Sequence, residues 1–345
     1  MTIGFVIQPQ GVSLEPLLDA ARIVKARTHV VIDEAKAVPA FQALGAQVIF
    51  RLSKDDHAHA KFDAAQFVEE LHATAPPGAL LHLGNEPGRN DLAQLNSWTL
   101  AALQACDRVG RRGVFFNFET GNPEPEQWAE LTDTMSYAYA NNHVCGLHEY
   151  FDAYVARSTP WHVGRFKNVY KTFGLQSPRI AITELGCAVH YNPYAGWQTY
   201  HTDVSYAAEL DTAMREHYAP YGIDALVYLL GYWDRSATFD VRGQTVIFER
   251  MAAMNAGNIP EEPEGDNMVP GYGRARTKQA GANVNLRGGP GLKHEPVGVV
   301  RTGDWVKRLP GSTVAADGYT WAQIALDRDA GSHQHGWVAT EVIEV

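Results

Sequence analysis

The first 255 residues alternate eight times between a short apolar run and a longer stretch whose apolar residues recur at helical spacing. The apolar runs are Ile3–Ile7, His29–Ile32, Gln47–Leu52, Leu80–Leu83, Gly113–Phe118, Val144–His148, Arg179–Thr183 and Ala225–Leu230. Strands that are apolar almost throughout are typical of a parallel sheet covered on both faces. Eight such units predict an α/β fold of the (β/α)8 TIM barrel type rather than an open doubly wound sheet. An open sheet commonly carries a GxGxxG or GxxxxGK[ST] turn after a strand, and none follows any of these runs.

The composition changes after the barrel segment, which we place at residues 1–256. Residues 257–281 are rich in proline, glycine and charge, which predicts a linker. Residues 282–345 contain short β runs separated by glycine turns, which predicts a small all-β barrel. This last segment resembles bacterial SH3 (SH3b) domains, and the matching residues are Asn283–Arg287, Gly289–Pro290, Gly298–Val299, Trp321 and Gly336–Val338.

Composition and charge exclude several classes of partner. No apolar run approaches the roughly 20 residues that cross a bilayer, so we expect no membrane span. The net charge of -10 disfavours nucleic acid as a partner, since binding phosphates normally needs a basic face.

The cysteines predict buried free thiols, because Cys106, Cys145 and Cys187 form no CxxC pair. The N-terminal MTIGFVIQPQ predicts a first strand rather than a signal peptide, which leaves a cytoplasmic, extracellular or cell-envelope location open.

Two predicted strands end in a glutamate. The fourth ends in Asn85-Glu86 and the seventh in Glu184. The carboxyl ends of barrel strands gather at one mouth, where barrel enzymes place their reactive groups. Two carboxyls about 5–5.5 Å apart can protonate a leaving oxygen and supply a nucleophile to an acetal carbon. Each glutamate alone is also compatible with capping a helix or turn.

This pairing resembles the retaining glycoside hydrolases of clan A, which carry Asn-Glu at the end of strand four and Glu at the end of strand seven. The resemblance implies that Glu86 is the acid/base, that Glu184 is the nucleophile and that Asn85 binds the sugar 2-hydroxyl. It also implies a tyrosine against the nucleophile, for which we choose Tyr150, and a tryptophan beneath the bound sugar, for which we choose Trp233.

Further residues at predicted strand ends are candidates for substrate binding. His148 shares a strand face with Tyr150, and Glu149 points the other way. Arg51 ends strand three and is compatible with orienting a carboxylate, with reaching substrate or with a structural ion pair. Asn117 and Glu119 end strand five, and Glu119 is the rival second carboxylate, although adjacent strands would not place it across the mouth from Glu86. Gln8 and Asp33, at the ends of strands one and two, are left undecided.

Aromatic residues and histidines are frequent in the loops after strands six to eight. Flat aromatic faces suit the C–H faces of sugars, and we choose Trp197 as a substrate platform. His148, His190 and His201 lack the close spacing of metal ligands, so we expect no catalytic metal and no other cofactor.

These features together predict a monomeric retaining glycoside hydrolase acting on a β-linked poly- or oligosaccharide. The SH3b resemblance implies a module that binds cell-wall peptide or glycan, and hence a cell-wall or envelope substrate. The two variants of this interpretation are a phage or bacterial wall lysin and an ordinary polysaccharide-degrading enzyme. The alternative is a non-catalytic glycan-binding protein on a hydrolase-like barrel. A barrel isomerase or aldolase would need a metal cluster or a Schiff-base lysine, and no predicted strand ends in lysine.

Overall fold

The computed structural model describes residues 1–53, 58–88, 90–152, 155, 162–188, 194–231, 237–257, 272–274, 276–277, 283–301, 305–327 and 333–344. The chain divides into two compact units, Met1–Pro260 and Glu261–Val345. Within the described ranges, no helix has both the length and the apolar character needed to cross a membrane.

The first unit is a closed barrel of eight parallel strands in sequence order, which confirms the predicted (β/α)8 fold. The strands are β1 (Ile3–Gln8), β2 (Thr28–Ile32), β3 (Gln47–Arg51), β4 (Leu80–Leu83), β5 (Gly113–Phe118), β6 (Val144–Phe151), β7 (Arg179–Cys187) and β8 (Asp224–Gly231). β8 pairs with β1, so the sheet has no free edge.

The strands are buried on both sides, which explains why their sequences are almost entirely apolar. In β1, Phe5 and Ile7 pack in the outer core between strands and helices. Val6, which lies between them, packs in the inner core with Val30 and Leu226 from the neighbouring strands. Successive side chains of one strand therefore fill two different cores.

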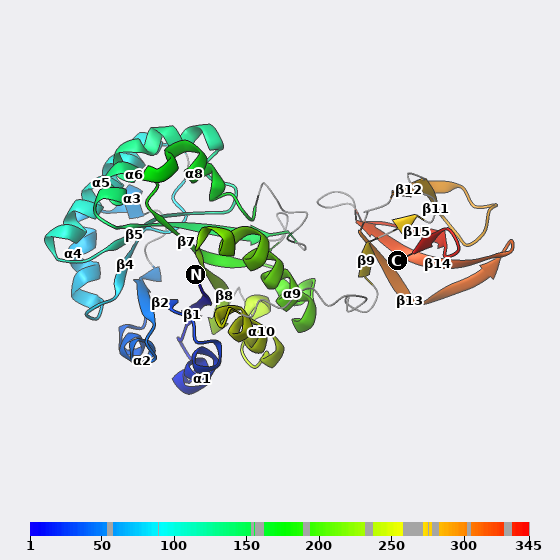
Figure 1. Cartoon of the computed structure of the whole chain (residues 1–345), viewed down its shortest axis with the longest axis horizontal. Helices are drawn as coiled ribbons and strands as arrows, with labels where there is room; N and C mark the ends of the chain where they lie inside the picture. Colours follow the sequence, from blue (N-terminus) through cyan, green and yellow to red (C-terminus); the bar gives the residue numbers. More distant parts are fainter. Residues whose placement is uncertain are drawn as a thin grey trace. The chain divides into compact units, whose positions relative to one another are not determined.

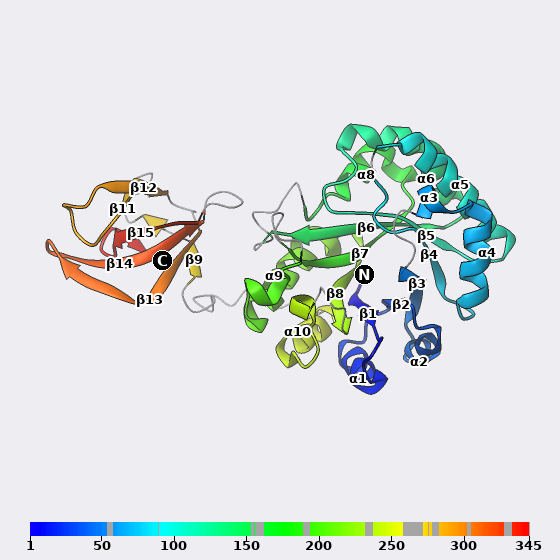
Figure 2. The same ribbon diagram turned by 180° about the vertical axis from the view of Figure 1, so that it is seen from behind.

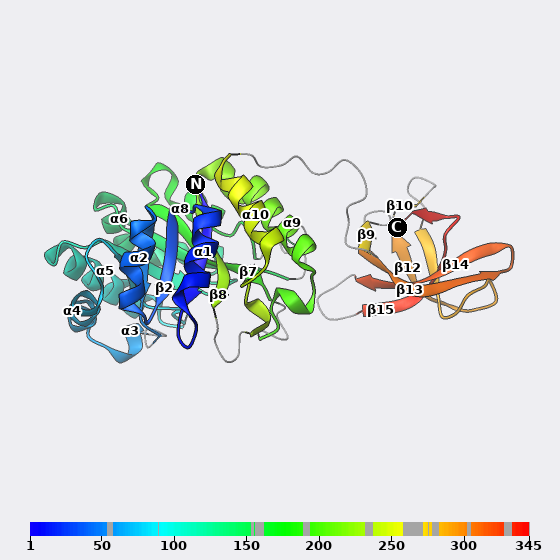
Figure 3. The ribbon, with the colours of Figure 1, turned by 90° about the horizontal axis from the view of Figure 1, so that it is seen from below.

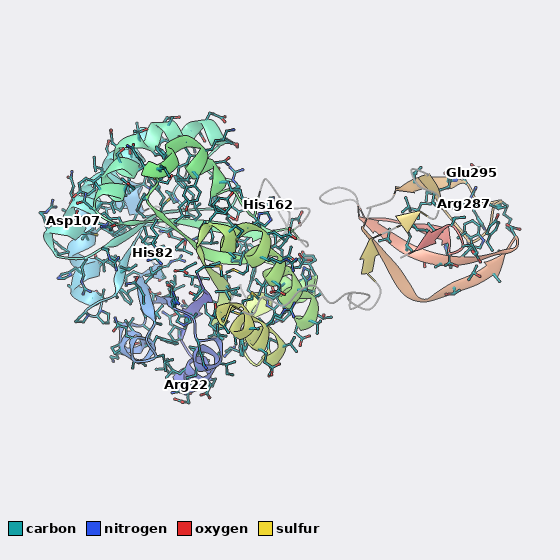
Figure 4. The ribbon with its side chains drawn as sticks, viewed as in Figure 1. Arg22, His82, Asp107, His162, Arg287 and Glu295 are labelled. Carbon is teal, nitrogen blue, oxygen red and sulfur yellow. The ribbon has the colours of Figure 1, made fainter. Side chains whose placement is uncertain are left out.

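Helices surround the strands, and the views from opposite sides show them forming a ring (Figure 1, Figure 2). The α-helices are α1 (Leu14–Val24), α2 (Val38–Ala43), α3 (Ala58–Lys61), α4 (Ala64–Thr74), α5 (Leu92–Arg108), α6 (Thr132–Ala140), α8 (Lys167–Phe173), α9 (Asp203–Ala213) and α10 (Thr245–Asn255). From below, α1, α2 and α10 lie along the outside of the barrel (Figure 3). Arg22 and Asp107 lie at the outer edge of this unit, whereas His82 on β4 lies among the strands (Figure 4).

Two helices have distinctive ends. α8 begins only at Lys167, because the backbone N–H groups of Gly164 and Phe166 donate to the carboxylate of Glu149 and hold a turn there. α9 is followed directly by a π-helical turn, Met214–Tyr218.

The second unit is all-β in its described part. Its strands are β9 (Tyr272–Arg274), β10 (Arg276–Thr277), β11 (Asn283–Arg287), β12 (Pro296–Arg301), β13 (Trp305–Ala316), β14 (Tyr319–Asp327), β15 (His333–Ala339) and β16 (Ile343–Glu344). Six of them form one sheet in the order β12-β11-β15-β14-β13-β9, and β10 pairs with β16. A small core contains Leu286, Val300, Val306, Ile324, Val338 and Ile343.

The predicted linker is too long at its C-terminal end. β9 pairs with β13 and β10 with β16, so residues 272–274 and 276–277 already contribute backbone hydrogen bonds to the second unit. Short polar strands of this kind are stabilised by pairing with distant strands, which the local composition does not reveal. The assignment of this unit as an SH3b domain stays a prediction.

Candidate active site

The structure brings Glu86 and Glu184 to the same end of the barrel. An oxygen of each carboxylate and a ring nitrogen of His148 all lie within 4.8 Å of one another. Glu184 lies within β7, whereas Glu86 follows β4 in a left-handed conformation with φ of 44°. The backbone N–H of Glu86 donates to the carbonyl of Asn117 at 3.1 Å, which holds this otherwise unfavourable conformation in place.

Both oxygens of Glu184 accept hydrogen bonds, one from the buried Arg51 and one from the partly buried Tyr150. Arg51 Nη1 donates to Oε1 at 2.8 Å, and the hydroxyl of Tyr150 donates to Oε2 at 2.6 Å. Burial, together with the charge of Glu184, raises the pKa of Tyr150 well above 10, so the phenol stays protonated as a donor. Arg51, for which the sequence left three roles open, thus forms an ion pair with Glu184.

His148 lies between the two glutamates. Its Nδ1 is 2.9 Å from Glu86 Oε1 and 3.6 Å from Glu184 Oε2. Burial alone would lower the pKa of His148, but the charges of Glu184 and Glu86 outweigh it, so the pKa is raised above its usual value. His148 can therefore donate a proton in a hydrogen bond to Glu86.

Glu149 points away from this group, as the period-two alternation of β6 predicts. Its buried carboxylate accepts from the backbone N–H of Gly164 at 2.6 Å, from that of Phe166 at 2.7 Å and from the hydroxyl of Tyr218 at 2.8 Å. Burial raises the pKa of Glu149 to about 7, although the three donors act in the opposite direction. Sequence reasoning gave Glu149 no role, yet an acidic residue on the outer face of a buried strand is a signal for such an anchor.

The structure places the two candidates from strand five in different surroundings. Glu119 is exposed and accepts a hydrogen bond from the amide of Asn122, so it does not join Glu86 and Glu184 as a third carboxylate. Asn117 is fully buried, and its side-chain amide binds Gly84 and Thr183. Protein groups occupy the polar atoms of Asn117, so its predicted substrate contact is wrong.

The two tryptophan predictions have different outcomes. Trp197 is only 3% exposed, stacks on Tyr206 with 5.0 Å between ring centroids, and donates its indole N–H to the carbonyl of Phe239 at 3.0 Å. A ring covered in this way presents no face to a sugar, so the platform prediction is wrong. Trp233 lies outside the described residues.

The remaining predicted residues lie near strand ends as expected. Asn85 and Gln8 are buried. Asp33 accepts from the backbone N–H of Ser53 at 2.7 Å and from the amide of Gln10 at 3.3 Å, which ties together the ends of β1, β2 and β3.

A cation bound by Glu86, His148 and Glu184 is geometrically conceivable, since each offers one ligand atom at suitable spacing. Arg51 and Tyr150 already bind the two oxygens of Glu184, and the guanidinium supplies the positive charge that a metal would bring. The donor set therefore favours an acid–base site over a metal centre.

The comparisons with known proteins give structural similarity only. No protein-family model matches this chain, and no curated protein matches it either. The endo-beta-1,4-mannanase from Thermotoga petrophila aligns over 98% of this chain and 97% of its own, with 10% identity and a TM-score of 0.51. The catalytic domain of a mannanase from Streptomyces sp. SirexAA-E aligns over 70% of this chain and 79% of its own, with 17% identity and a TM-score of 0.49.

An endo-beta-1,3-glucanase from Amycolatopsis mediterranei, solved with laminaritriose, covers 73% of this chain and 99% of its own, with 15% identity and a TM-score of 0.49. These structural neighbours are glycoside hydrolases named for β-glycan substrates. The mannanase from Thermotoga petrophila, at 10% identity and a TM-score of 0.51, shows a shared fold, and a shared fold does not by itself assign a chemistry to this chain.

Proposed function

We propose that this protein is a retaining glycoside hydrolase that cleaves a β-linked poly- or oligosaccharide. The observation that carries the proposal is the approach of the Glu86 and Glu184 carboxylates, which have oxygens within 4.8 Å of each other. Inverting enzymes keep their two carboxyls about 6.5–9.5 Å apart to admit a water molecule, whereas retaining enzymes keep them about 5–5.5 Å apart. The spacing here supports direct attack by a carboxylate on the anomeric carbon.

The surroundings of the two glutamates support different roles for them. The side chain of Glu184 is 8% exposed and is held by Arg51 and Tyr150, which suits an ionised and oriented nucleophile. The side chain of Glu86 is 41% exposed, so a leaving group and later a water molecule can reach it.

The proposed reaction has two steps. In the first, Glu184 attacks the anomeric carbon while the protonated Glu86 gives its proton to the glycosidic oxygen, and the C–O bond to the leaving sugar breaks. In the second, Glu86 removes a proton from water, the resulting hydroxide oxygen attacks the same carbon, and the ester bond to Glu184 breaks. Asn85 is proposed to bind the sugar 2-hydroxyl next to this centre.

The proposed substrate class is a β-glycan. The structural neighbours are named for mannan and glucan, which favours a β-glycan. For the second unit we propose the binding of cell-wall peptide or glycan, on the SH3b resemblance. Sedimentation of the protein with purified peptidoglycan tests that role, and failure to co-sediment would contradict it.

A direct test compares wild type with Glu86→Gln and Glu184→Gln on a panel of β-glycans and aryl β-glycosides. Wild type is expected to release sugar, and both variants should lose activity by about 10³-fold or more, since they remove the proton donor or the nucleophile. Glu119→Gln is the matched control, an exposed glutamate outside the group, and should be unaffected.

Azide and product stereochemistry test the assignment of roles. With an activated aryl glycoside, azide should rescue Glu184→Ala and give a glycosyl azide of inverted configuration, whereas Glu86→Ala should give the retained configuration. The first sugar released by wild type should be the β-anomer. A folded Glu184→Ala that azide does not rescue would move the nucleophile elsewhere. Absence of turnover by wild type, with glycan binding unchanged in Glu184→Gln, would instead favour the glycan-binding protein.

A further inference from the structure

Asn117 makes contact with the protein segments that carry both candidate catalytic glutamates. Its backbone carbonyl accepts from the N–H of Glu86 at 3.1 Å, and its side-chain Nδ2 donates to the carbonyl of Gly84 at 2.9 Å. These two contacts lie on either side of Asn85, so Asn117 holds the turn after β4 at two points. On its other side, Oδ1 accepts from the hydroxyl of Thr183 at 3.0 Å, and Thr183 immediately precedes Glu184.

The Asn117 side chain reaches β7 by passing over β6, the strand that separates β5 from β7. The residue on β6 beneath it is Gly146, and a Cβ at that position would lie 1.9 Å from Asn117 Oδ1 and 3.2 Å from the Thr183 hydroxyl. Any side chain larger than hydrogen would therefore displace the amide. Gly146 has a specific physical role here, which is to leave space for this hydrogen bond.

The backbone of β5 is distorted at the same place. Phe116 and Asn117 have φ values of 66° and 48°, and the pairing of β5 with β6 shifts register between Phe116 and Phe118. Non-glycine residues rarely adopt such angles without compensation. The bulge turns the Asn117 amide sideways into the barrel, where the hydrogen bonds to Gly84 and Thr183 provide that compensation.

We propose that Asn117 is a positioning residue that sets the separation between Glu86 and Glu184, acting through Gly84 and the Glu86 backbone on one side and through Thr183 on the other. The inference rests on the proposed function and extends it to a residue that touches neither substrate nor the reacting atoms. One amide linking both strand ends makes the two carboxylates move together rather than independently. Catalysis by double displacement depends on that separation, since a misplacement of about 1 Å can cost roughly 100-fold in rate.

The test removes the hydrogen bond between Thr183 and Asn117 by changing Thr183, because the backbone of Asn117 is itself distorted. Thr183→Val keeps the shape of the side chain and removes the hydroxyl, whereas Thr183→Ser keeps the hydroxyl. The matched control is Thr134→Val, because Thr134 is also fully buried and donates to a carbonyl, that of Asn96 at 2.8 Å, between α6 and α5. All three variants are measured for unfolding midpoint and for kcat and KM on the substrate identified for wild type.

The expected result is specific to positioning. Thr183→Val should lower kcat by about 10- to 100-fold with little change in KM, and Thr183→Ser should restore most of the loss. The bell-shaped pH profile of kcat/KM should also become narrower in Thr183→Val, because two carboxyls that lie further apart influence each other's ionisation less. Thr134→Val should lower the unfolding midpoint without changing kcat or the width of the profile.

Gly146→Ala is a second perturbation of the same hydrogen bond, made from β6. The added methyl group should displace the Asn117 amide, lower kcat and narrow the pH profile of kcat/KM as Thr183→Val does. An active wild type together with an active Thr183→Val of unchanged kcat and unchanged pH profile would overturn this inference and leave the proposed function standing. A fall in kcat that Thr183→Ser does not restore would also overturn it. An inactive wild type would overturn the proposed function and this inference with it.

Discussion

The ion pair between Arg51 and Glu184 provides a quantitative test of how the candidate nucleophile is held. The two side chains are 3% and 8% exposed, and the nitrogen and oxygen are 2.8 Å apart. Removing one partner of a buried pair typically costs about 3–5 kcal/mol, because the other charge is left buried without compensation. Exposed pairs are worth only about 0–1 kcal/mol. For Arg51→Met we expect the free energy of unfolding to fall by about 3 kcal/mol, at the lower end because Tyr150 still donates to Glu184.

A double-mutant cycle separates the pair from the other contacts of each residue. Glu184→Gln keeps the size of the side chain and removes the charge, so it should also destabilise the protein by taking the carboxylate away from the buried guanidinium of Arg51. The double variant Arg51→Met/Glu184→Gln buries no unpaired charge from this pair. Its loss should therefore be smaller than the sum of the single losses, by about 1–3 kcal/mol.

Urea unfolding followed by helical circular dichroism measures these energies in the barrel unit, since the described part of the second unit contains only strands. A loss below about 1 kcal/mol in Arg51→Met would show that the pair behaves like an exposed one. Strictly additive losses in the double variant would show that the two charges do not interact. Either result would refute the account of Glu184 as a carboxylate held in a buried ion pair with Arg51.

Three further predictions concern acid stability, catalysis and metal dependence. Burial lowers the pKa of His29 from 6.5 to about 4, so the stability that the neutral ring contributes is complete above pH 6.5 and is lost as the pH falls toward 4. Over that pH range, urea unfolding should show that wild type loses about 3 kcal/mol more of its free energy of unfolding than His29→Gln does. Equal losses would contradict this prediction. Tyr150→Phe should lower kcat/KM by about 10- to 100-fold in steady-state assays, because it removes a hydrogen bond to a buried charge, and unchanged kinetics would exclude a role at Glu184. Treatment with EDTA should leave hydrolysis unchanged, and a loss that added metal restores would assign Glu86, His148 and Glu184 to a metal centre.

The barrel and the place of the paired glutamates follow from the sequence alone. Strands buried on both faces must be apolar at nearly every position, so eight such runs between helical segments are sufficient to indicate the closed parallel sheet. Glu86 and Glu184 stand out because each interrupts apolar character where a strand ends. That His148 and Tyr150 lie on the same side of β6 was predictable too, since alternation along a strand decides which side chains share a face.

The tertiary structure decided which of the other candidates reach the site. The period-two alternation of side chains does not hold on β5. The bulge at Phe116 and Asn117 turns the Asn117 amide into the barrel, and Glu119 is exposed to solvent. Trp197 is covered because Tyr206, nine positions further along the chain, packs flat against it. Bulges and packing between distant loops depend on which side chains meet in space, and period-two or period-3.6 patterns carry no information about those meetings. The sequence marked Asn117 only as a strand-end candidate, and the hydrogen bonds behind its proposed positioning role come from the tertiary structure.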